Sequence, residues 1–367
     1  MKKHILFILA AIMTACCLVA CSSDKNSGST GTNSGNSGSK KLNIVTTIFP
    51  EYDWVMNILG SNPGGAEVTM LLDNGVDLHS YQPTVGDILK VSSCDMFIYV
   101  GGESDEWVQD VLKEATNKDM VVINLLDVLG SSVKEEEVVE GMQEEEHHHD
   151  HENEDHDHED EDHDHEDEDH EDEDHEDEDH DHDHEDGEVE YDEHVWLSLK
   201  NAATLVESIS KSLETLDSAN ADAYKSNASS YIEKLNSLDA QYQAATKDAA
   251  VKTLLFGDRF PFRYLTDDYG LSYYAAFVGC SAETEASFKT ITFLSGKMDE
   301  LSLHAIMTIE GNDHKIANTI IENTAAKDAK VLTLDSMQAT TSKDVKNGAS
   351  YMSIMENNLA VLKEALK

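Results

Sequence analysis

Short apolar runs alternate with amphipathic segments in the first third of the chain. Four runs rich in Val, Ile and other apolar residues are typical of strands buried on both faces of a parallel sheet: residues 41–48, 66–72, 95–100 and 121–124. Segments with apolar residues at helical spacing separate them: residues 50–59, 83–93 and 104–116. Strands that alternate with helices predict a first α/β lobe.

The pattern resumes after a polar stretch with two long amphipathic segments, 198–216 and 220–247. The second has no internal Gly or Pro, so we expect a straight, rigid helix. Further strands are predicted at residues 252–256, 271–278, 304–309 and 331–334, and further helices at 262–269, 284–301, 315–323 and 348–366. The predicted fold class is α/β, with two lobes of mostly parallel sheet flanked by helices and joined by one long helix.

The chain begins with the features of a targeting segment. A basic start is followed by an apolar stretch at 5–15, which is too short for a typical membrane-spanning helix. Residues 18–21 (LVAC) resemble a bacterial lipobox, in which Cys21 becomes lipidated, although a plain secretory signal cleaved after Ala20 is the alternative. We therefore expect an extracytoplasmic protein that is lipid-anchored to the bacterial cell membrane.

Composition shifts indicate the boundaries of the parts. We expect a signal peptide at residues 1–20, followed by a lipidated Cys and a flexible Ser/Gly-rich tether at 21–40. An N-terminal lobe should occupy 41–219, with a disordered insert at 134–190. A linking helix at 220–248 and a C-terminal lobe at 249–367 should follow.

The insert contains the strongest chemical signal in the chain. Its central residues, 144–186, comprise 13 His, 29 Asp or Glu and one Asn, with no apolar residue to form a core. Imidazole suits zinc, copper and nickel, so the run predicts metal capture rather than only a solvated acidic segment. Its histidines are His147, His148, His149, His151, His156, His158, His163, His165, His170, His175, His180, His182 and His184.

Charge and cysteine content narrow the classes of protein. The formal net charge is −48, and the chain outside the His-rich run still holds 26 basic against 45 acidic residues. Nucleic acid is therefore not an expected partner, because it requires a basic patch. Two of the five cysteines, Cys94 and Cys280, lie outside the signal region and are predicted to be buried free thiols.

Four residues with metal-binding side chains lie where ligand groups gather in open parallel sheets, beyond the carboxyl ends of strands. His79 follows the second predicted strand, Glu310 and Asp335 follow two later strands, and His194 precedes a helix. Each also has a structural explanation: a surface His, a loop anchor, a helix cap or a packed ring. Convergence from both lobes would place a cation in the cleft between them.

These segments resemble the zinc- and manganese-binding solute-binding lipoproteins of bacterial ABC importers. The resemblance covers nearly the whole chain after the tether. It is carried by residues 44–50 (IVTTIFP), 75–83 (GVDLHSYQP), 192–197 (DEHVWL), 334–336 (LDS) and 351–359. It implies metal ligands at His79, His194 and Asp335. A His-rich loop upstream of the second His is a feature of the zinc members, so Zn²⁺ is expected and Mn²⁺ less so.

One position departs from that family. Its third ligand, a His or Glu, precedes a Tyr-Gly-Leu segment, and the equivalent position here is Arg259. A guanidinium has no lone pair for a cation, so another group completes the site, or Arg259 balances a carboxylate such as Asp335 or Glu310. Candidates for completion are Cys280, Glu283, Glu285 or a water, with His304 and His314 as weaker ones.

The resemblance implies a monomeric binding component that delivers Zn²⁺ to an ABC permease and is not itself an enzyme. No Gly-Lys-Ser/Thr phosphate loop and no His-Glu-x-x-His motif occurs in the chain. The His-rich run would collect zinc or sense its abundance. The main alternative is a surface metal buffer in which that run is the principal site; a metallohydrolase and an added adhesion role are further alternatives.

Overall fold

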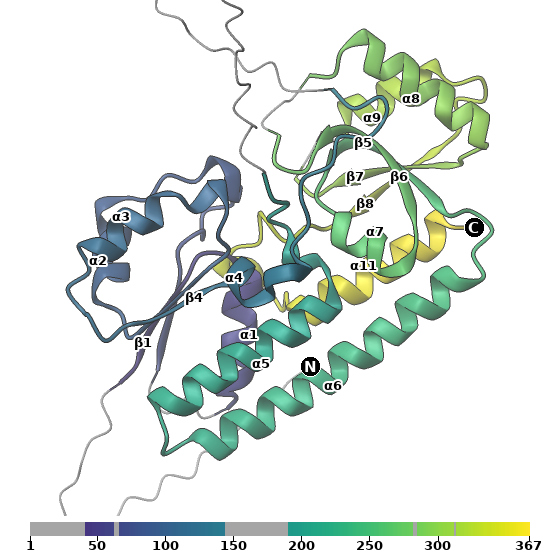
Figure 1. The fold of residues 1–367 in the computed structure, drawn as a ribbon. Helices are drawn as coiled ribbons and strands as arrows, with labels where there is room; N and C mark the ends of the chain where they lie inside the picture. The colour runs from purple at the N-terminus through teal and green to yellow at the C-terminus, as the bar shows by residue number, and fades with distance from the viewer. Residues whose placement is uncertain (1–40, 62–65, 144–189, 282–284, 312) are drawn as a thin grey trace, which may run out of the picture. The chain divides into compact units, whose positions relative to one another are not determined.

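Two four-stranded parallel sheets organise the computed structural model, which describes residues 41–61, 66–143, 190–281, 285–311 and 313–367 (Figure 1). The first sheet has the order β2-β1-β3-β4 and comprises β1 (Asn43–Thr46), β2 (Glu67–Met70), β3 (Met96–Tyr99) and β4 (Val121–Asn124). The second has the order β6-β5-β7-β8 and comprises β5 (Thr253–Phe260), β6 (Ser272–Val278), β7 (Ala305–Ile309) and β8 (Lys330–Leu334). All paired strands run parallel, which confirms the predicted α/β class.

Helices of the first half follow its strands. They are α1 (Phe49–Leu59), α2 (Val85–Ser93), α3 (Trp107–Lys113) and the short α4 (Leu125–Leu129), with 3-10 turns η1 (Leu78–Ser80), η2 (Glu103–Asp105) and η3 (Gly130–Ser132). Local chemistry sets their ends: Pro50 lies in the first turn of α1, and Gly60 ends that helix at a φ of 68°. Thr84 and Asp87 form a capping box at the start of α2.

Two long helices connect the halves. The turn η4 (Val195–Leu197) leads into α5 (Leu199–Leu216), and α6 (Ala221–Lys247) packs antiparallel along it (Figure 1). Helix α6 also contacts α1 in the first half and α7 and α11 in the second. Because α6 is uninterrupted over 27 residues, it is the long linking helix that the sequence predicts.

The second half repeats the alternation of strands and helices. Its helices are α7 (Arg263–Tyr269), α8 (Phe288–Leu301), α9 (Lys315–Asn323), α10 (Ser342–Lys346) and α11 (Tyr351–Ala365). The helix predicted at 348–366 is α11, which begins at Tyr351 because Ser350 and Ser353 form a capping box after the Gly348 turn. Helices α4 and α10 were not predicted, and α8 begins later than expected, at Phe288.

A single large apolar core extends from the first sheet to the second, and a smaller one lies among β5, β6, β7, α8 and α9. Aromatic residues join the halves within the large core. The Trp196 indole Nε1 donates to the Ser336 carbonyl at 2.8 Å, and the Tyr351 hydroxyl donates to the Trp196 carbonyl at 2.6 Å. The Tyr351 ring packs edge-on against Trp54 of α1. The residues around His194 are therefore fixed from both halves.

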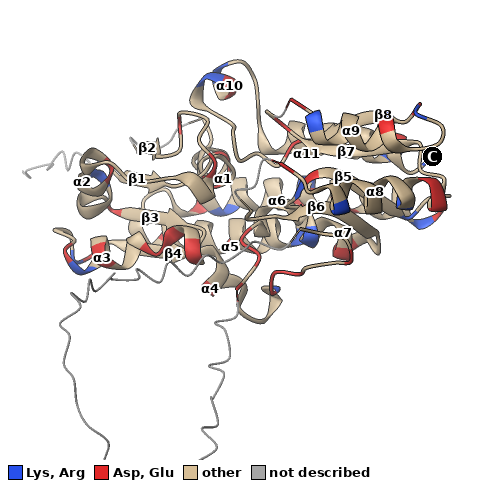
Figure 2. Cartoon of the chain, turned by 90° about the horizontal axis from the view of Figure 1, so that it is seen from above, with Lys and Arg blue, Asp and Glu red and all other residues tan. Residues whose placement is uncertain are grey.

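The segments that flank the His-rich run lie against the second half. Glu135 forms a β-bridge with Tyr191, and the Gln143 amide donates to the Ala276 carbonyl of β6 at 2.9 Å. The run itself, the proposed signal peptide and Cys21 lie outside the described residues. Lys and Arg are scattered over both halves among Asp and Glu (Figure 2). No helix within the described ranges has the length and apolarity to cross a membrane.

Candidate metal centre

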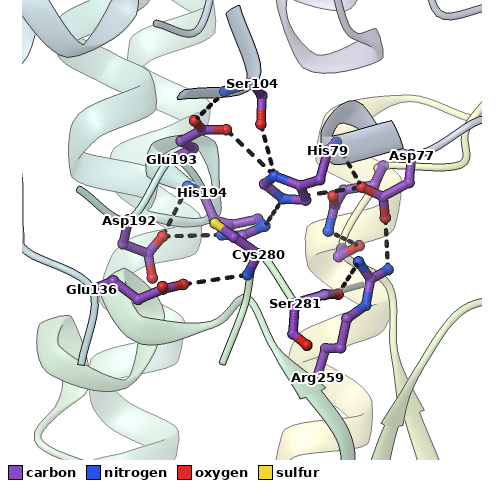
Figure 3. A network of polar contacts seen from close by, with 12 residues as sticks. Asp77, His79, Ser104, Glu136, Asp192, Glu193, His194, Arg259, Cys280 and Ser281 are labelled. Atoms are coloured by element: carbon purple, nitrogen blue, oxygen red, sulfur yellow. Dashed lines mark hydrogen bonds and ion pairs between the residues drawn. The ribbon is translucent and has the colours of Figure 1, made fainter. Parts of the chain in front are cut away.

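His79 is held in a tight turn that follows β2. It is the central residue of η1, whose N-cap is Asp77, and the Asp77 Oδ1 atom accepts a 3.0 Å hydrogen bond from the His79 amide. The imidazole Nδ1 lies 2.8 Å from Ser104 Oγ and 3.5 Å from Glu193 Oε2 (Figure 3). With Nδ1–H directed at these oxygen atoms, the lone pair is on Nε2.

His194 has the same arrangement at the entrance to η4. The Asp192 Oδ1 atom accepts from the His194 amide at 2.9 Å and lies 3.0 Å from the ring Nδ1. The His194 side chain is fully buried. A hydrogen placed on Nδ1 by Asp192 again leaves the Nε2 lone pair for another partner.

The two Nε2 atoms face each other at 3.1 Å (Figure 3). When each ring carries its hydrogen on Nδ1, two lone pairs converge, and they repel unless a proton or a cation lies between them. This pair of donors, each oriented by an outer carboxylate or hydroxyl, is the arrangement in which proteins bind divalent metals through histidine. The geometry therefore indicates a cation site on the Nε2 side of both rings.

Electrostatics around the pair favour a neutral His79. Burial and the facing His194 lower the pKa of His79 to about 3. Burial opposes a charge on His194 as well, but Asp192 and Glu193 raise its pKa above the ordinary value overall. Any shared proton is therefore held by His194, while His79 presents its lone pair. Burial raises the pKa of Glu193 to about 7.

Cys280 is the third member of the cluster. It follows β6 by two residues, and its Sγ, a nitrogen of His79 and a nitrogen of His194 all lie within 4.8 Å of one another. Its amide donates to Glu136 Oε1 at 3.3 Å. Burial, followed by the charge of Glu136, raises the pKa of the thiol well above its ordinary value. Among the residues that the structure describes, this is the one group of three His, Cys, Asp or Glu side chains whose ligand atoms lie so close.

Arg259 lies in β5, because that strand extends to Phe260 rather than ending at residue 256 as predicted. It does balance a carboxylate, but the partner is Asp77 and not Asp335 or Glu310: the guanidinium donates to Asp77 Oδ2 at 2.6 Å. A second nitrogen donates to the Ser281 carbonyl at 3.2 Å. Arg259 thereby connects the loop of His79 to the loop of Cys280.

The remaining candidates have other surroundings. Asp335 Oδ1 accepts from the Met337 amide at 2.8 Å, and the Asp335 carboxylate is not in the 4.8 Å cluster. Burial and the charge of Glu310 raise the pKa of Asp335 to about 7. Glu310 accepts hydrogen bonds from the amides of Ser336 and Gln338, so it anchors the loop after β8. Glu283 lies outside the described residues, as does the His-rich run, and neither His304 nor His314 belongs to the cluster.

Several residues of the site were missed from the sequence alone. Asp77 and Asp192 each accept a hydrogen bond from the amide of the histidine two positions later. Glu193 accepts from the Ser104 amide, Ser104 contacts the His79 ring, and Glu136 accepts from the Cys280 amide. The repeated Asp-x-His pattern, 77–79 and 192–194, was the available signal. Asp side chains readily bond the backbone two residues on and fix such turns.

The comparisons with known proteins agree with this architecture. Residues 44–365 match the family described as "Zinc-uptake complex component A periplasmic". The "Zinc-binding protein AdcA" of a Streptococcus pyogenes serotype M3 strain is 31% identical over 327 residues, which are 88% of this chain and 56% of that protein. The "High-affinity zinc uptake system protein ZnuA" of Bacillus subtilis is 28% identical over 98% of this chain and 97% of its own length. The chain thus spans little more than half of the streptococcal relative.

A solved structure has the same fold. The Zn(II)-bound ZnuA-like domain of Streptococcus pneumoniae AdcA aligns with a TM-score of 0.62 and 26% identity, over 89% of this chain and 99% of that one. The family match begins within β1 and ends with α11, so it includes nearly all of both sheets and both long helices, α5 and α6. The chain therefore belongs to the family of the periplasmic component A of zinc-uptake complexes.

Proposed function

We propose that this chain is the extracytoplasmic solute-binding component of a zinc ABC importer and that it captures Zn²⁺ between its two halves through His79 and His194. The observation that carries this proposal is the 3.1 Å approach of the two Nε2 atoms. Tetrahedral zinc with Zn–N distances of about 2.0–2.1 Å separates two nitrogen ligands by roughly 3.3 Å. The observed separation of the two nitrogen atoms is thus close to the separation that a shared zinc ion requires.

Further ligands would come from the second half. We include Asp335, in the loop after β8, as a carboxylate ligand; its pKa of about 7 means that an arriving cation displaces a proton there. The uninterrupted α6, which contacts both halves, favours a small relative movement during capture over a wide hinge closure.

The cellular setting follows from the sequence and from the names of the relatives. The Streptococcus pneumoniae R6 relative, 30% identical over 99% of this chain, is named "Zinc-binding lipoprotein AdcA". We propose the same anchoring here, through Cys21, with delivery of zinc to a membrane permease. The His-rich run serves as an accessory zinc collector or sensor rather than as the principal site, because a run without apolar residues has no means of fixing a coordination geometry.

Calorimetric titration of the full chain with Zn²⁺ tests the proposal. We expect one tight site above a set of weaker ones, and loss of the tight site in His79→Ala and His194→Ala. The exposed His304, outside the cluster, provides the matched control His304→Ala. Deletion of residues 144–186 should remove the weak sites and keep the tight one. Loss of all tight binding on that deletion, with no effect of His79→Ala, would instead favour the metal-buffer alternative.

A further inference from the structure

The two cysteines of the described chain have different surroundings. Cys94 is buried at the end of α2, where its thiol donates to the Val91 carbonyl at 3.2 Å and lies 3.2 Å from Met120 Sδ. Cys280 is partly exposed and belongs to the cluster of His79 and His194. Cys94 is therefore a packing residue, whereas Cys280 lies where a metal ligand is needed.

The backbone that follows β6 packs closely against the His194 ring. A Cβ atom on Gly279 would lie 2.9 Å from His194 Cε1 and 3.1 Å from its Nδ1, so glycine is the residue that lets the backbone approach the imidazole this closely. The next residue is Cys280, whose amide is held by Glu136. The position of Cys280 is thus fixed by the packing of Gly279 against His194 and by the hydrogen bond from its own amide to Glu136.

Arg259 fixes the same loop from the other side. Its guanidinium bonds both the Asp77 carboxylate, which holds the His79 turn, and the Ser281 carbonyl, next to Cys280. An arginine cannot itself coordinate a cation. It is a positioning residue that sets the distance between an imidazole and a thiol.

We propose that the Cys280 thiolate is the third zinc ligand and that it determines the metal preference of the site. The assignment rests on the proposed function, because it requires that His79 and His194 hold the cation. Thiolate is a soft donor that binds zinc at about 2.3 Å and suits Zn²⁺ and Cd²⁺, whereas Mn²⁺ prefers carboxylate and water oxygen atoms. With Asp335 as the proposed carboxylate ligand, the donors are two imidazoles, one thiolate and one carboxylate, and the soft thiolate among them favours zinc over manganese by donor type and not by cavity size.

Cobalt(II) titration of the full chain provides the direct test. A thiolate ligand gives a thiolate-to-cobalt charge-transfer band in the near ultraviolet, whereas His and carboxylate groups of the insert give none. We expect this band to saturate at one equivalent, to disappear in Cys280→Ala, and to remain in Cys94→Ala and in a chain with Cys16, Cys17 and Cys21 changed to Ser. Cys280→Ala should lower Zn²⁺ affinity by about 100-fold or more, with little change for Mn²⁺.

A second measurement needs no change at Cys280. Zinc should slow the alkylation of Cys280 by iodoacetamide, followed by mass spectrometry, and this protection should be lost in His79→Ala; the Cys94 peptide is the internal control. Tight, His79-dependent zinc binding without the cobalt band or the protection would overturn the assignment and leave the proposed function standing. Absence of any His79-dependent tight site would overturn both.

Discussion

The Arg259 guanidinium donates a 2.6 Å hydrogen bond to Asp77 Oδ2, and the other oxygen of the same carboxylate accepts from the His79 amide at 3.0 Å. One carboxylate thus links a strand of the second half to the turn that carries a proposed ligand of the first. The charge of Arg259, together with hydrogen bonds to Asp77, keeps the pKa of Asp77 low even though burial alone would raise it. The pair is therefore ionised at neutral pH and holds the His79 turn in place.

Removing the guanidinium should weaken zinc binding without removing a ligand. We expect Arg259→Ala to lower Zn²⁺ affinity by about 10- to 100-fold, the usual effect of losing a residue that orients metal ligands. Arg259→Lys should recover little, because an ammonium cannot bond Asp77 and the Ser281 carbonyl through two separate nitrogen atoms in the same geometry. Competition with a chromophoric chelator measures the affinity.

Lys90→Ala is the control for Arg259, since Lys90 forms a surface ion pair with Asp87 on α2. It should leave the affinity unchanged. The cobalt(II) spectrum distinguishes positioning from general destabilisation: Arg259→Ala should shift the thiolate band as well as weaken binding. An unchanged affinity in Arg259→Ala would contradict the role of the pair.

Asp192 should control how zinc affinity depends on pH. The raised pKa of His194 means that a proton competes with zinc at its Nε2, and zinc also displaces protons from Asp335 and the Cys280 thiol, so affinity should rise with pH throughout the range 5 to 8. Asp192→Asn removes the charge that stabilises the imidazolium, so the part of the rise that comes from His194 should occur at lower pH. The orienting hydrogen bond also weakens, so the affinity at pH 8 should fall by about 10-fold.

Zinc titrations between pH 5 and 8, with wild type and Asp192→Asn side by side, measure both effects. His79 should contribute no step in this range, because its pKa is about 3. Affinities with the same pH dependence in wild type and Asp192→Asn would contradict the shared-proton arrangement, because Asp192 would then have no influence on the protonation of His194.

The strands of both sheets and the long helix α6 were predictable from the sequence, because local patterns specify them. The parallel strands and the uninterrupted helix α6 follow from apolar periodicity and from the lack of Gly and Pro between residues 221 and 247. The position of Arg259 within a strand was not predictable in this way. Strand β5 continues from Phe256 to Phe260 only because it pairs with β6, and the register of that pairing shifts between Phe256 and Arg259. Strand ends set by tertiary pairing carry little local signal.

The same limit applies to the site. Both histidines could be found from their motifs, but the partner of Arg259 could not, since Asp77 is 182 positions away and the sequence favoured Asp335 or Glu310 equally well. Cys280 was an open candidate until the fold placed it beside His79 and His194. Its sequence context, a lone Cys after an apolar strand, is equally typical of an inert buried thiol such as Cys94.

Asp335→Asn tests the proposed carboxylate ligand. In the metal-free protein, burial and Glu310 raise the pKa of Asp335 to about 7, so at pH 8 its charge is destabilising. The variant should therefore have a higher Tm than wild type without metal, but a smaller rise in Tm when zinc is added. Asp313→Asn, at an exposed turn, is the control. An undiminished zinc-induced rise in Asp335→Asn would exclude this residue as a ligand.

Asp53, which is not a member of the metal-ligand cluster, should make stability fall as pH rises. Burial raises its pKa from 3.8 to about 6, although Tyr231 donates a 3.2 Å hydrogen bond to the carboxylate. Between pH 3.8 and about 6 the folded state binds more protons than the unfolded state, so stability falls as pH rises through this range. The loss is complete about one pH unit above the folded pKa. A shift of about 2 units corresponds to roughly 3 kcal/mol.

Asp53→Asn removes this titration, so its free energy of unfolding relative to wild type should increase by roughly 3 kcal/mol between pH 3.5 and 7. Urea unfolding of metal-free protein at several pH values measures the difference, and other buried acids cancel because both chains contain them. Asp344→Asn should show a trend of the opposite sign, since hydrogen bonds from Thr341 lower the pKa of that exposed carboxyl. A difference between Asp53→Asn and wild type that stays constant with pH would mean that Asp53 is not held in its protonated form by burial.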